Sequence, residues 1–143
     1  MPADQWVAVA RAVIRIGDQL LVAQGRGDTF THLPGGHVEA SELPVEALLR
    51  EGREELGRDA SDVQPLADFD NIYDDAKTGQ TIHEHNHIFS VKLFPYGQEF
   101  PPTSKEDHLI LRWIALSDVD RERLMPPAVR PLISGAPRAR AVA

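Results

Sequence analysis

One strong helix signal, set among strand-like segments, most constrains what this chain can fold into. Over residues 42–56, the apolar side chains at Val45, Leu48, Leu49 and Leu56 are spaced to form one helix face. A Pro-Gly-Gly break at residues 34–36 precedes this segment, and Gly57 is a typical residue at a helix C-terminus. Ser41 is the expected N-cap, and Pro44 falls in the first turn, where a missing N–H costs little.

The segments on either side of this helix have the pattern of strands. Residues 6–16 and 20–24, joined by a short turn, predict a hairpin at the start of the chain. Three further extended segments are predicted over residues 63–73, 81–94 and 109–116. This order of elements predicts an α/β (α+β) fold, in which a mixed β-sheet is sandwiched between helices.

The C-terminal part of the chain combines loop, short helix and tail. Residues 95–107 contain three prolines and predict an exposed loop. Ser117 is expected to cap a short helix over residues 118–124, and a second short helix is expected after Pro127. With 143 residues, the chain suits one domain over residues 1–134, followed by a flexible tail at 135–143.

Composition limits the classes of function. The N-terminal segment lacks the pattern of a secretory leader, no apolar run is long enough to span a membrane, and cysteine is absent. A soluble, cytoplasmic protein without thiol chemistry is therefore expected. The formal net charge of −7 argues against stable nucleic-acid binding. An acidic protein that handles phosphates needs local charge neutralisation, which a divalent metal usually supplies.

Acidic side chains are concentrated on one side of the predicted helix. Glu54 and Glu55 follow Glu51 by three and four residues, so the carboxylates lie close together and repel one another. A hard cation such as Mg²⁺, which prefers oxygen ligands, would turn this repulsion into binding. Arg50 could hold a carboxylate in place, and the glycines at 35–36 would allow the backbone to approach a metal or phosphate closely. Taken alone, such a run is usually a solvated helix face.

Residues 36–58, GHVEASELPVEALLREGREELGR, resemble the Nudix box, GX5EX7REUXEEXGU, in which U is a bulky aliphatic residue. Both U positions depart from the pattern, because they hold Gly52 and Arg58. All the fixed positions match, namely Gly36, Glu42, Arg50, Glu51, Glu54, Glu55 and Gly57. The departures concern the seating of the helix on the sheet, since the U residues anchor it in the family. Glycine also costs about 1 kcal/mol of helix propensity relative to alanine.

The resemblance implies a Nudix hydrolase, a pyrophosphatase-type enzyme that cleaves a diphosphate bond in a nucleoside diphosphate linked to another moiety. It implies a Mg²⁺ cofactor, with Mn²⁺ as a substitute, and four metal ligands: Gly36 through its carbonyl, Glu51, Glu54 and Glu55. The predicted catalytic residues are Arg50, Glu51, Glu54 and Glu106. Glu106, outside the box, is a candidate ligand or base, although a solvated loop acid is the alternative.

Three histidines alternate along the segment 81–94, so His83, His85 and His87 should share one face of a strand, opposite Glu84 and Asn86. The face could be a polar surface, line the substrate cleft or hold a transition metal. The predicted substrate-binding residues are Arg26, His32, His37, Tyr73, His85 and His87. For Arg26, His32 and His37, ordinary loop positions are the alternative.

Three hypotheses are compatible with these features. The first is a hydrolase of a nucleotide diphosphate or triphosphate, with no membrane partner and able to form a homodimer. The second is a Nudix-fold nucleotide sensor that lacks catalysis, for which only Gly52 and Arg58 argue. The third is an unrelated domain with an accidental match. The sequence does not identify the substrate.

Overall fold

The long helix forms where the sequence predicts it, with a different N-terminal cap. In the computed structural model, which describes residues 4–57, 59–93 and 106–133, helix α1 spans Pro44–Leu56. The predicted cap at Ser41 is wrong: Leu43 is the N-cap, and its N–H donates to Glu46 Oε1 at 2.8 Å. Proline fixes the backbone at the first helical position, and the glutamate returns to satisfy the free donor before it. The predicted stop at Gly57 is confirmed, with a φ of 68°.

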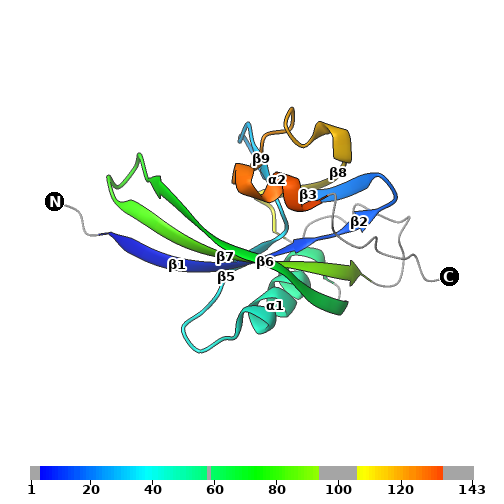
Figure 1. Cartoon of the computed structure of the whole chain (residues 1–143), viewed down its shortest axis with the longest axis horizontal. Coiled ribbons are helices and arrows are strands. Elements are labelled where there is room, and N and C mark those ends of the chain that lie inside the picture. Colours follow the sequence, from blue (N-terminus) through cyan, green and yellow to red (C-terminus); the bar gives the residue numbers. More distant parts are fainter. Residues whose placement is uncertain (1–3, 58, 94–105, 134–143) are drawn as a thin grey trace.

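The sheet with the longer strands, called the larger sheet below, has four strands in the order β5-β1-β7-β6 (Figure 1). Strands β1 and β7 are parallel, whereas β1–β5 and β6–β7 are antiparallel. The strands are β1 (Gln5–Val13), β5 (Gly35–His37), β6 (Ala60–Asp74) and β7 (Thr81–Leu93). Strand β5 leads towards α1 through residues 38–43, so this sheet edge and the helix are adjacent.

The second sheet has the order β2-β3-β4-β9, with β8 paired to β3. Its strands are β2 (Arg15–Ile16), β3 (Gln19–Gly25), β4 (Thr31–His32), β8 (Leu109–Ala115) and β9 (Leu124–Met125). The predicted opening hairpin is therefore much shorter than expected. Only Arg15 and Ile16 pair with β3, because the chain leaves the first sheet at Ile14 and enters the second.

The C-terminal elements agree with the sequence in part. No α-helix forms over 118–124, and Ser117 is not its cap; the 3₁₀ turn η1 (Leu116–Asp118) is followed by turns over residues 119–123. A left-handed residue, Arg123 with φ 54°, interrupts helical geometry there. After Pro126, η2 (Pro127–Val129) and α2 (Arg130–Ile133) confirm the second predicted helix. Residues 94–105 and 134–143, which include most of the predicted loop and the predicted tail, lie outside the described residues.

Two apolar clusters lie on opposite faces of the strands. One joins α1 to both sheets and includes Ala12, Leu21 and Leu48. The other joins both sheets to η2 and α2 and includes Ile88, Val129 and Ile133. In Figure 1, α1 accordingly lies below the strands and α2 above them. The predicted mixed sheet sandwiched between helices is confirmed. Among the described residues, no helix has the length and apolar character needed to cross a membrane.

Candidate active site

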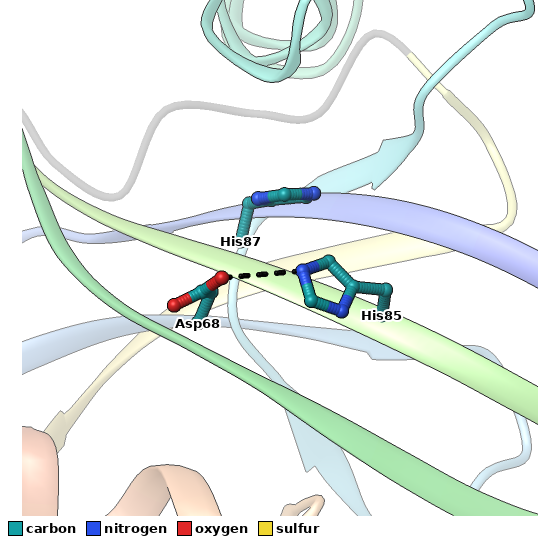
Figure 2. Close-up of side chains that lie close together, drawn as sticks. All are labelled: Asp68, His85 and His87. Atoms are coloured by element: carbon teal, nitrogen blue, oxygen red, sulfur yellow. Dashed lines mark ion pairs between the residues drawn. The ribbon is translucent and has the colours of Figure 1, made fainter.

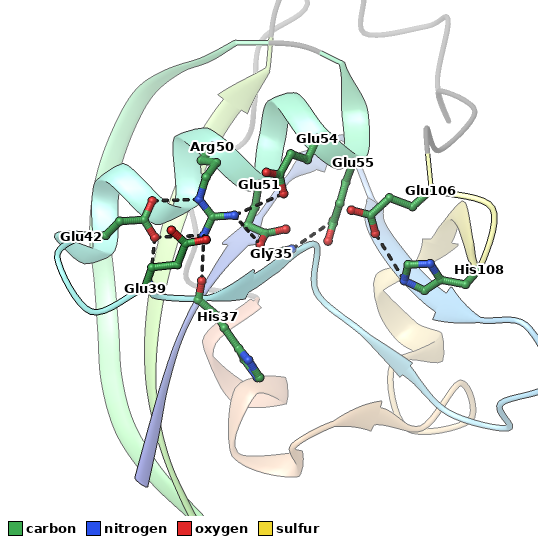
Figure 3. A network of polar contacts seen from close by, with 10 residues as sticks. All are labelled: Gly35, His37, Glu39, Glu42, Arg50, Glu51, Glu54, Glu55, Glu106 and His108. Carbon is green, nitrogen blue, oxygen red and sulfur yellow. Dashed lines mark hydrogen bonds and ion pairs between the residues drawn. The ribbon is translucent and has the colours of Figure 1, made fainter.

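Three carboxylates converge beside the C-terminal half of α1 (Figure 3). Glu51 and Glu54 come from successive turns of the helix, and Glu106 precedes β8. One carboxylate oxygen from each lies within 4.8 Å of the others. The helical spacing predicts that Glu51 and Glu54 are neighbours. The fold brings Glu106, which the sequence offers as a candidate ligand or base, next to them. These three residues are called the carboxylate group below.

Arg50 connects the carboxylate group to Glu42 and to the His37 carbonyl, which precede the helix. Its guanidinium donates to both oxygens of Glu42, at 2.8 and 2.9 Å, which is a bidentate pair. It also donates to Glu51 Oε1 at 3.0 Å, to Glu54 Oε2 at 3.2 Å and to the His37 carbonyl at 2.9 Å. The side chain thus orients two members of the carboxylate group and ties them to the loop before the helix.

The charges around Arg50 shift the neighbouring carboxyls in different directions. Hydrogen bonds from Arg50 and from the Glu39 N–H lower the pKa of Glu42 to about 2. Burial raises the pKa of Glu51, and the nearby Glu54 and Glu106 add to this, while Arg50 opposes it. The group therefore carries more negative charge than one arginine neutralises, which favours an added cation.

Glu55 lies near Glu51 and Glu106 in Figure 3 but is not a member of the carboxylate group, although the sequence resemblance implies that it is a metal ligand. Its side chain is 4% exposed and accepts from the Gly35 N–H at 3.3 Å. Burial, together with the charge of Glu51, raises its pKa to about 8, and Arg11 opposes this shift. The described cluster of possible ligands contains Glu51, Glu54 and Glu106 but not Glu55.

The two glycines of the turn permit the close approach that the sequence predicts. Gly35 has φ +143°, and a Cβ there would lie 2.0 Å from the Ala10 carbonyl oxygen. A Cβ on Gly36 would lie 2.5 Å from the Glu51 carboxyl. Any larger residue at 36 would displace a carboxylate that Arg50 holds in place. The predicted use of the Gly36 carbonyl as a ligand stays a prediction.

A pocket of about 400 Å³ opens between the two sheets. Its volume falls in the usual range for small-molecule sites, about 300–1,000 Å³. Phe30 and Tyr73, respectively 37% and 44% exposed, contribute aromatic surface, and Met125 adds apolar surface. Glu84 and Asn86 contribute polar groups from β7, and Asn86 Nδ2 donates to the Glu84 side chain at 3.1 Å.

Arg11 lines this pocket and lies close enough to the acidic helix to feel the charges of its carboxylates. Its Nη1 donates to the Leu33 carbonyl at 3.2 Å and lies 3.4 Å from His32 Nδ1. Burial lowers its pKa, while the charges of Glu55, Glu84 and Glu51 oppose that shift. Arg11 is not among the site residues that the sequence predicts. The signal was a lone arginine within the apolar run VAVARAVI, since a buried cation needs acidic or polar partners.

The predicted substrate-binding residues separate into two sets. Tyr73 and His32 line the pocket. Arg26 donates to the Asp107 carbonyl beside Glu106, and Figure 3 shows the His37 ring directed away from the carboxylates. His85 and His87 lie on the opposite face of β7 from Glu84 and Asn86, so they do not line the pocket.

The atypical position Gly52 faces the sheet and lines a cavity of about 20 Å³ between α1 and the strands. Ala12, Leu48 and Val91 also border this cavity. This volume is much smaller than a bulky aliphatic side chain, so the neighbouring residues already occupy most of the space that such a residue would need. The other atypical position, Arg58, lies outside the described residues.

Comparison with known proteins agrees with this geometry. A model of the NUDIX domain matches residues 5–134. A MutT NUDIX hydrolase from Burkholderia pseudomallei superimposes with a TM-score of 0.70 at 24% identity, over 92% of this chain and 98% of that one. A NUDIX hydrolase from Nitrosomonas europaea gives 0.65 at 20% identity, over 94% and 93%. A mutator MutT protein from Bacillus halodurans gives 0.67 at 18%, over 93% and 85%. Among curated proteins there is no significant match.

Proposed function

This chain belongs to the NUDIX domain family and is a Nudix-type pyrophosphohydrolase, and from that premise we propose a Mg²⁺-dependent reaction on a nucleotide. The bond cleaved is a diphosphate bond in a nucleoside diphosphate linked to another moiety, or in a nucleoside triphosphate, by attack of water. The observation that carries the proposal is the convergence of Glu51, Glu54 and Glu106 within 4.8 Å.

The donor set fits a hard divalent cation. All three side chains offer carboxylate oxygens, which suit Mg²⁺ and Mn²⁺ better than softer metals. Glu51 and Glu54 already share Arg50, yet a third carboxylate from Glu106 leaves excess negative charge. Glu55 and the Gly36 carbonyl are proposed as further ligands, as the resemblance implies. A bound Mg²⁺ supplies charge neutralisation at the diphosphate and a more acidic water.

The chain's own residues supply the remaining chemistry. Arg50 orients Glu51 and Glu54, so that the reacting groups need little rearrangement. Glu51 or Glu106 is proposed to take the proton from the attacking water, because both lie in the carboxylate group. Arg11 lines the pocket and is proposed to supply positive charge to the phosphate groups of the substrate.

The pocket fits the nucleoside part of such a substrate. A base could stack on Phe30 or Tyr73, while Asn71 and Asn86 offer hydrogen-bonding groups beside it. His32 lines the same pocket and is retained as a substrate-binding residue. Arg26 and His37 stay predictions from the sequence. A cytoplasmic location, a homodimer and the absence of stable nucleic-acid binding also belong to this proposal.

The direct test is a panel of nucleoside triphosphates and diphosphate-linked nucleotides, assayed for phosphate or pyrophosphate release. Mg²⁺ and Mn²⁺ are compared at two pH values. We expect turnover of at least one member only with metal, and its loss in Glu54→Gln. Glu46→Gln is the matched control, because this exposed glutamate lies on the same helix and glutamine can still accept from Leu43.

The outcomes separate the alternatives. Metal-dependent turnover that survives in Glu46→Gln and fails in Glu54→Gln supports the hydrolase. Nucleotide binding without turnover of any panel member supports the sensor that lacks catalysis. If neither metal changes turnover, binding or melting temperature, the proposed use of the carboxylate group is wrong.

A further inference from the structure

Three side chains on the α1 face of the larger sheet form a second group of potential metal ligands (Figure 2). We propose that Asp68, His85 and His87 bind a divalent transition-metal ion, of which Zn²⁺ is the type case, at a site separate from the carboxylate group. These three residues are called the imidazole group below.

The strand register brings the three side chains together. His85 and His87 are two residues apart on β7, so both point to the same face. On the neighbouring strand β6, Asp68 pairs with His87 and Asp70 pairs with His85. One ligand atom from each member of the imidazole group lies within 4.8 Å of the others. Metal bonds of about 2.0–2.2 Å in a tetrahedron place ligand atoms roughly 3.4 Å apart. Small rotations of these partly exposed side chains would be enough to close the site.

A supporting carboxylate orients His85 as metal-binding histidines are usually oriented. His85 Nδ1 lies 2.6 Å from Asp70 Oδ1, and His85 Nε2 lies 3.3 Å from Asp68 Oδ2. If Nδ1 carries the proton and donates to Asp70, the lone pair of Nε2 faces Asp68, where a cation would complete the contact. A carboxylate that fixes the tautomer of a ligating imidazole is typical of metal sites.

His87 distinguishes this arrangement from a simple ion pair. A protonated His85 between two aspartates would account for Asp68 and Asp70 without any metal. His87 would add nothing to such a pair, yet its ring contacts that of His85 edge-on, with centroids 4.5 Å apart. Among the described residues, the imidazole ring of His87 makes no hydrogen bond. A half-buried imidazole with unused nitrogens beside a second imidazole and a carboxylate fits a shared cation.

The donor types select the class of metal. Two imidazole nitrogens and one carboxylate suit Zn²⁺, Co²⁺, Ni²⁺ or Cu²⁺, whereas Mg²⁺ prefers oxygen ligands alone. Three protein ligands leave a fourth position for water. The side chains of Asp68 and His85 are 66% and 42% exposed, so an ion can enter directly from solvent. Because β6 is the edge strand, the ion would join that edge to β7.

The third histidine of the strand supplies a matched control. His83 lies on the same face, but its ring stacks on Trp6 with centroids 4.4 Å apart. Its Nε2 also pairs with Asp4 Oδ2 at 3.1 Å. His83 is absent from the imidazole group, so its removal should leave metal binding intact.

The test is equilibrium dialysis of the full chain against Zn²⁺, with bound metal counted by mass spectrometry. Millimolar Mg²⁺ is present throughout to occupy the carboxylate group. We expect one Zn²⁺ per chain, and affinity at least tenfold weaker in His85→Ala, His87→Ala and Asp68→Asn. Asp70→Asn should weaken binding roughly 10–100-fold, as expected for a supporting partner. His83→Asn should bind as the unmodified chain does.

Two further measurements test whether the Zn²⁺ bound belongs to the imidazole group. Asp68→Asn changes an exposed side chain, so it tests the site even if a histidine variant fails to fold, and circular dichroism checks each variant. A Glu51→Gln, Glu54→Gln double variant should retain Zn²⁺ binding. The proposal is overturned if Zn²⁺ does not bind in Mg²⁺ excess, if Asp68→Asn binds normally, or if binding is lost in the double variant instead.

Discussion

The carboxylate group and the imidazole group, both in this single chain, differ in the donor atoms that they offer to a metal. The carboxylate group uses oxygens alone, and its orienting partner is a cation, Arg50. The imidazole group uses mainly nitrogens, and its orienting partner is an anion, Asp70. A guanidinium can restrain carboxylates that would otherwise repel, whereas a carboxylate fixes the tautomer of an imidazole. The charge of the residue that orients each group therefore also indicates which donor atoms the group presents to a metal.

The two groups also differ in how the chain assembles them. The helix period brings Glu51 and Glu54 together, while the strand period brings His85 and His87 together. Each pair is completed by a residue from another segment, Glu106 before β8 in one case and Asp68 on β6 in the other. The pairs are local and readable from sequence, but the completing residues depend on tertiary structure.

The strongest test of whether the two groups act independently is to remove a charge from the carboxylate group. Glu54→Gln should lower the rate of nucleotide hydrolysis roughly 10²-fold or more. A metal ion contributes several kcal/mol to such a transition state, and each ~1.4 kcal/mol is a factor of ten. Zn²⁺ binding by the imidazole group should not change in this variant. Steady-state rates at saturating Mg²⁺ and Zn²⁺ dialysis together check both statements. If the variant loses both functions, the two groups are not independent.

A smaller effect is expected from replacing the partner that orients the carboxylates. Arg50→Lys keeps the charge but loses the planar fork that contacts Glu42, Glu51 and Glu54. The apparent affinity for Mg²⁺ should fall about 10–100-fold, measured from the Mg²⁺ dependence of the rate.

Arg53→Lys is the control for Arg50, because this exposed arginine lies on the same helix and pairs only with Asp59 among the described residues. Its Mg²⁺ dependence should match that of the unmodified chain. Equal effects of the two substitutions would mean that general helix charge, and not the contacts of Arg50, sets metal affinity.

The pair of Arg50 with Glu42 also makes stability depend on pH. The folded-state pKa of Glu42 is about 2, below its ordinary value of 4.5. The stabilisation is therefore complete above that ordinary value and is lost as the pH falls towards 2. Glu42→Gln should lower the urea midpoint at neutral pH, and the difference from the unmodified chain should shrink as acid is added. A difference that is constant with pH would contradict an ionic origin.

How far the sequence predicts this molecule depends on the distance between the residues concerned. The acidic face of α1, its stop at Gly57 and the shared face of the histidines follow from local periodicity, and the structure has them all. Local patterns do not predict that β1 pairs with β5 and β7 in the first sheet. Nor do they predict that Arg11 lines the pocket and interacts electrostatically with carboxylates of the acidic helix. Those features depend on which strands pair, and strand pairing depends on contacts that are distant in sequence.

The smallest expected effect concerns how firmly the acidic helix is seated on the sheet. Gly52 lowers helix propensity and borders a cavity of about 20 Å³. Gly52→Ala should raise the free energy of unfolding by about 1 kcal/mol, because alanine favours the helix and its methyl group adds contacts. Urea denaturation with an unchanged m-value checks this. A leucine at 52 exceeds the available space and should destabilise the chain. If alanine is also destabilising, the helix lies closer to the sheet than the cavity indicates.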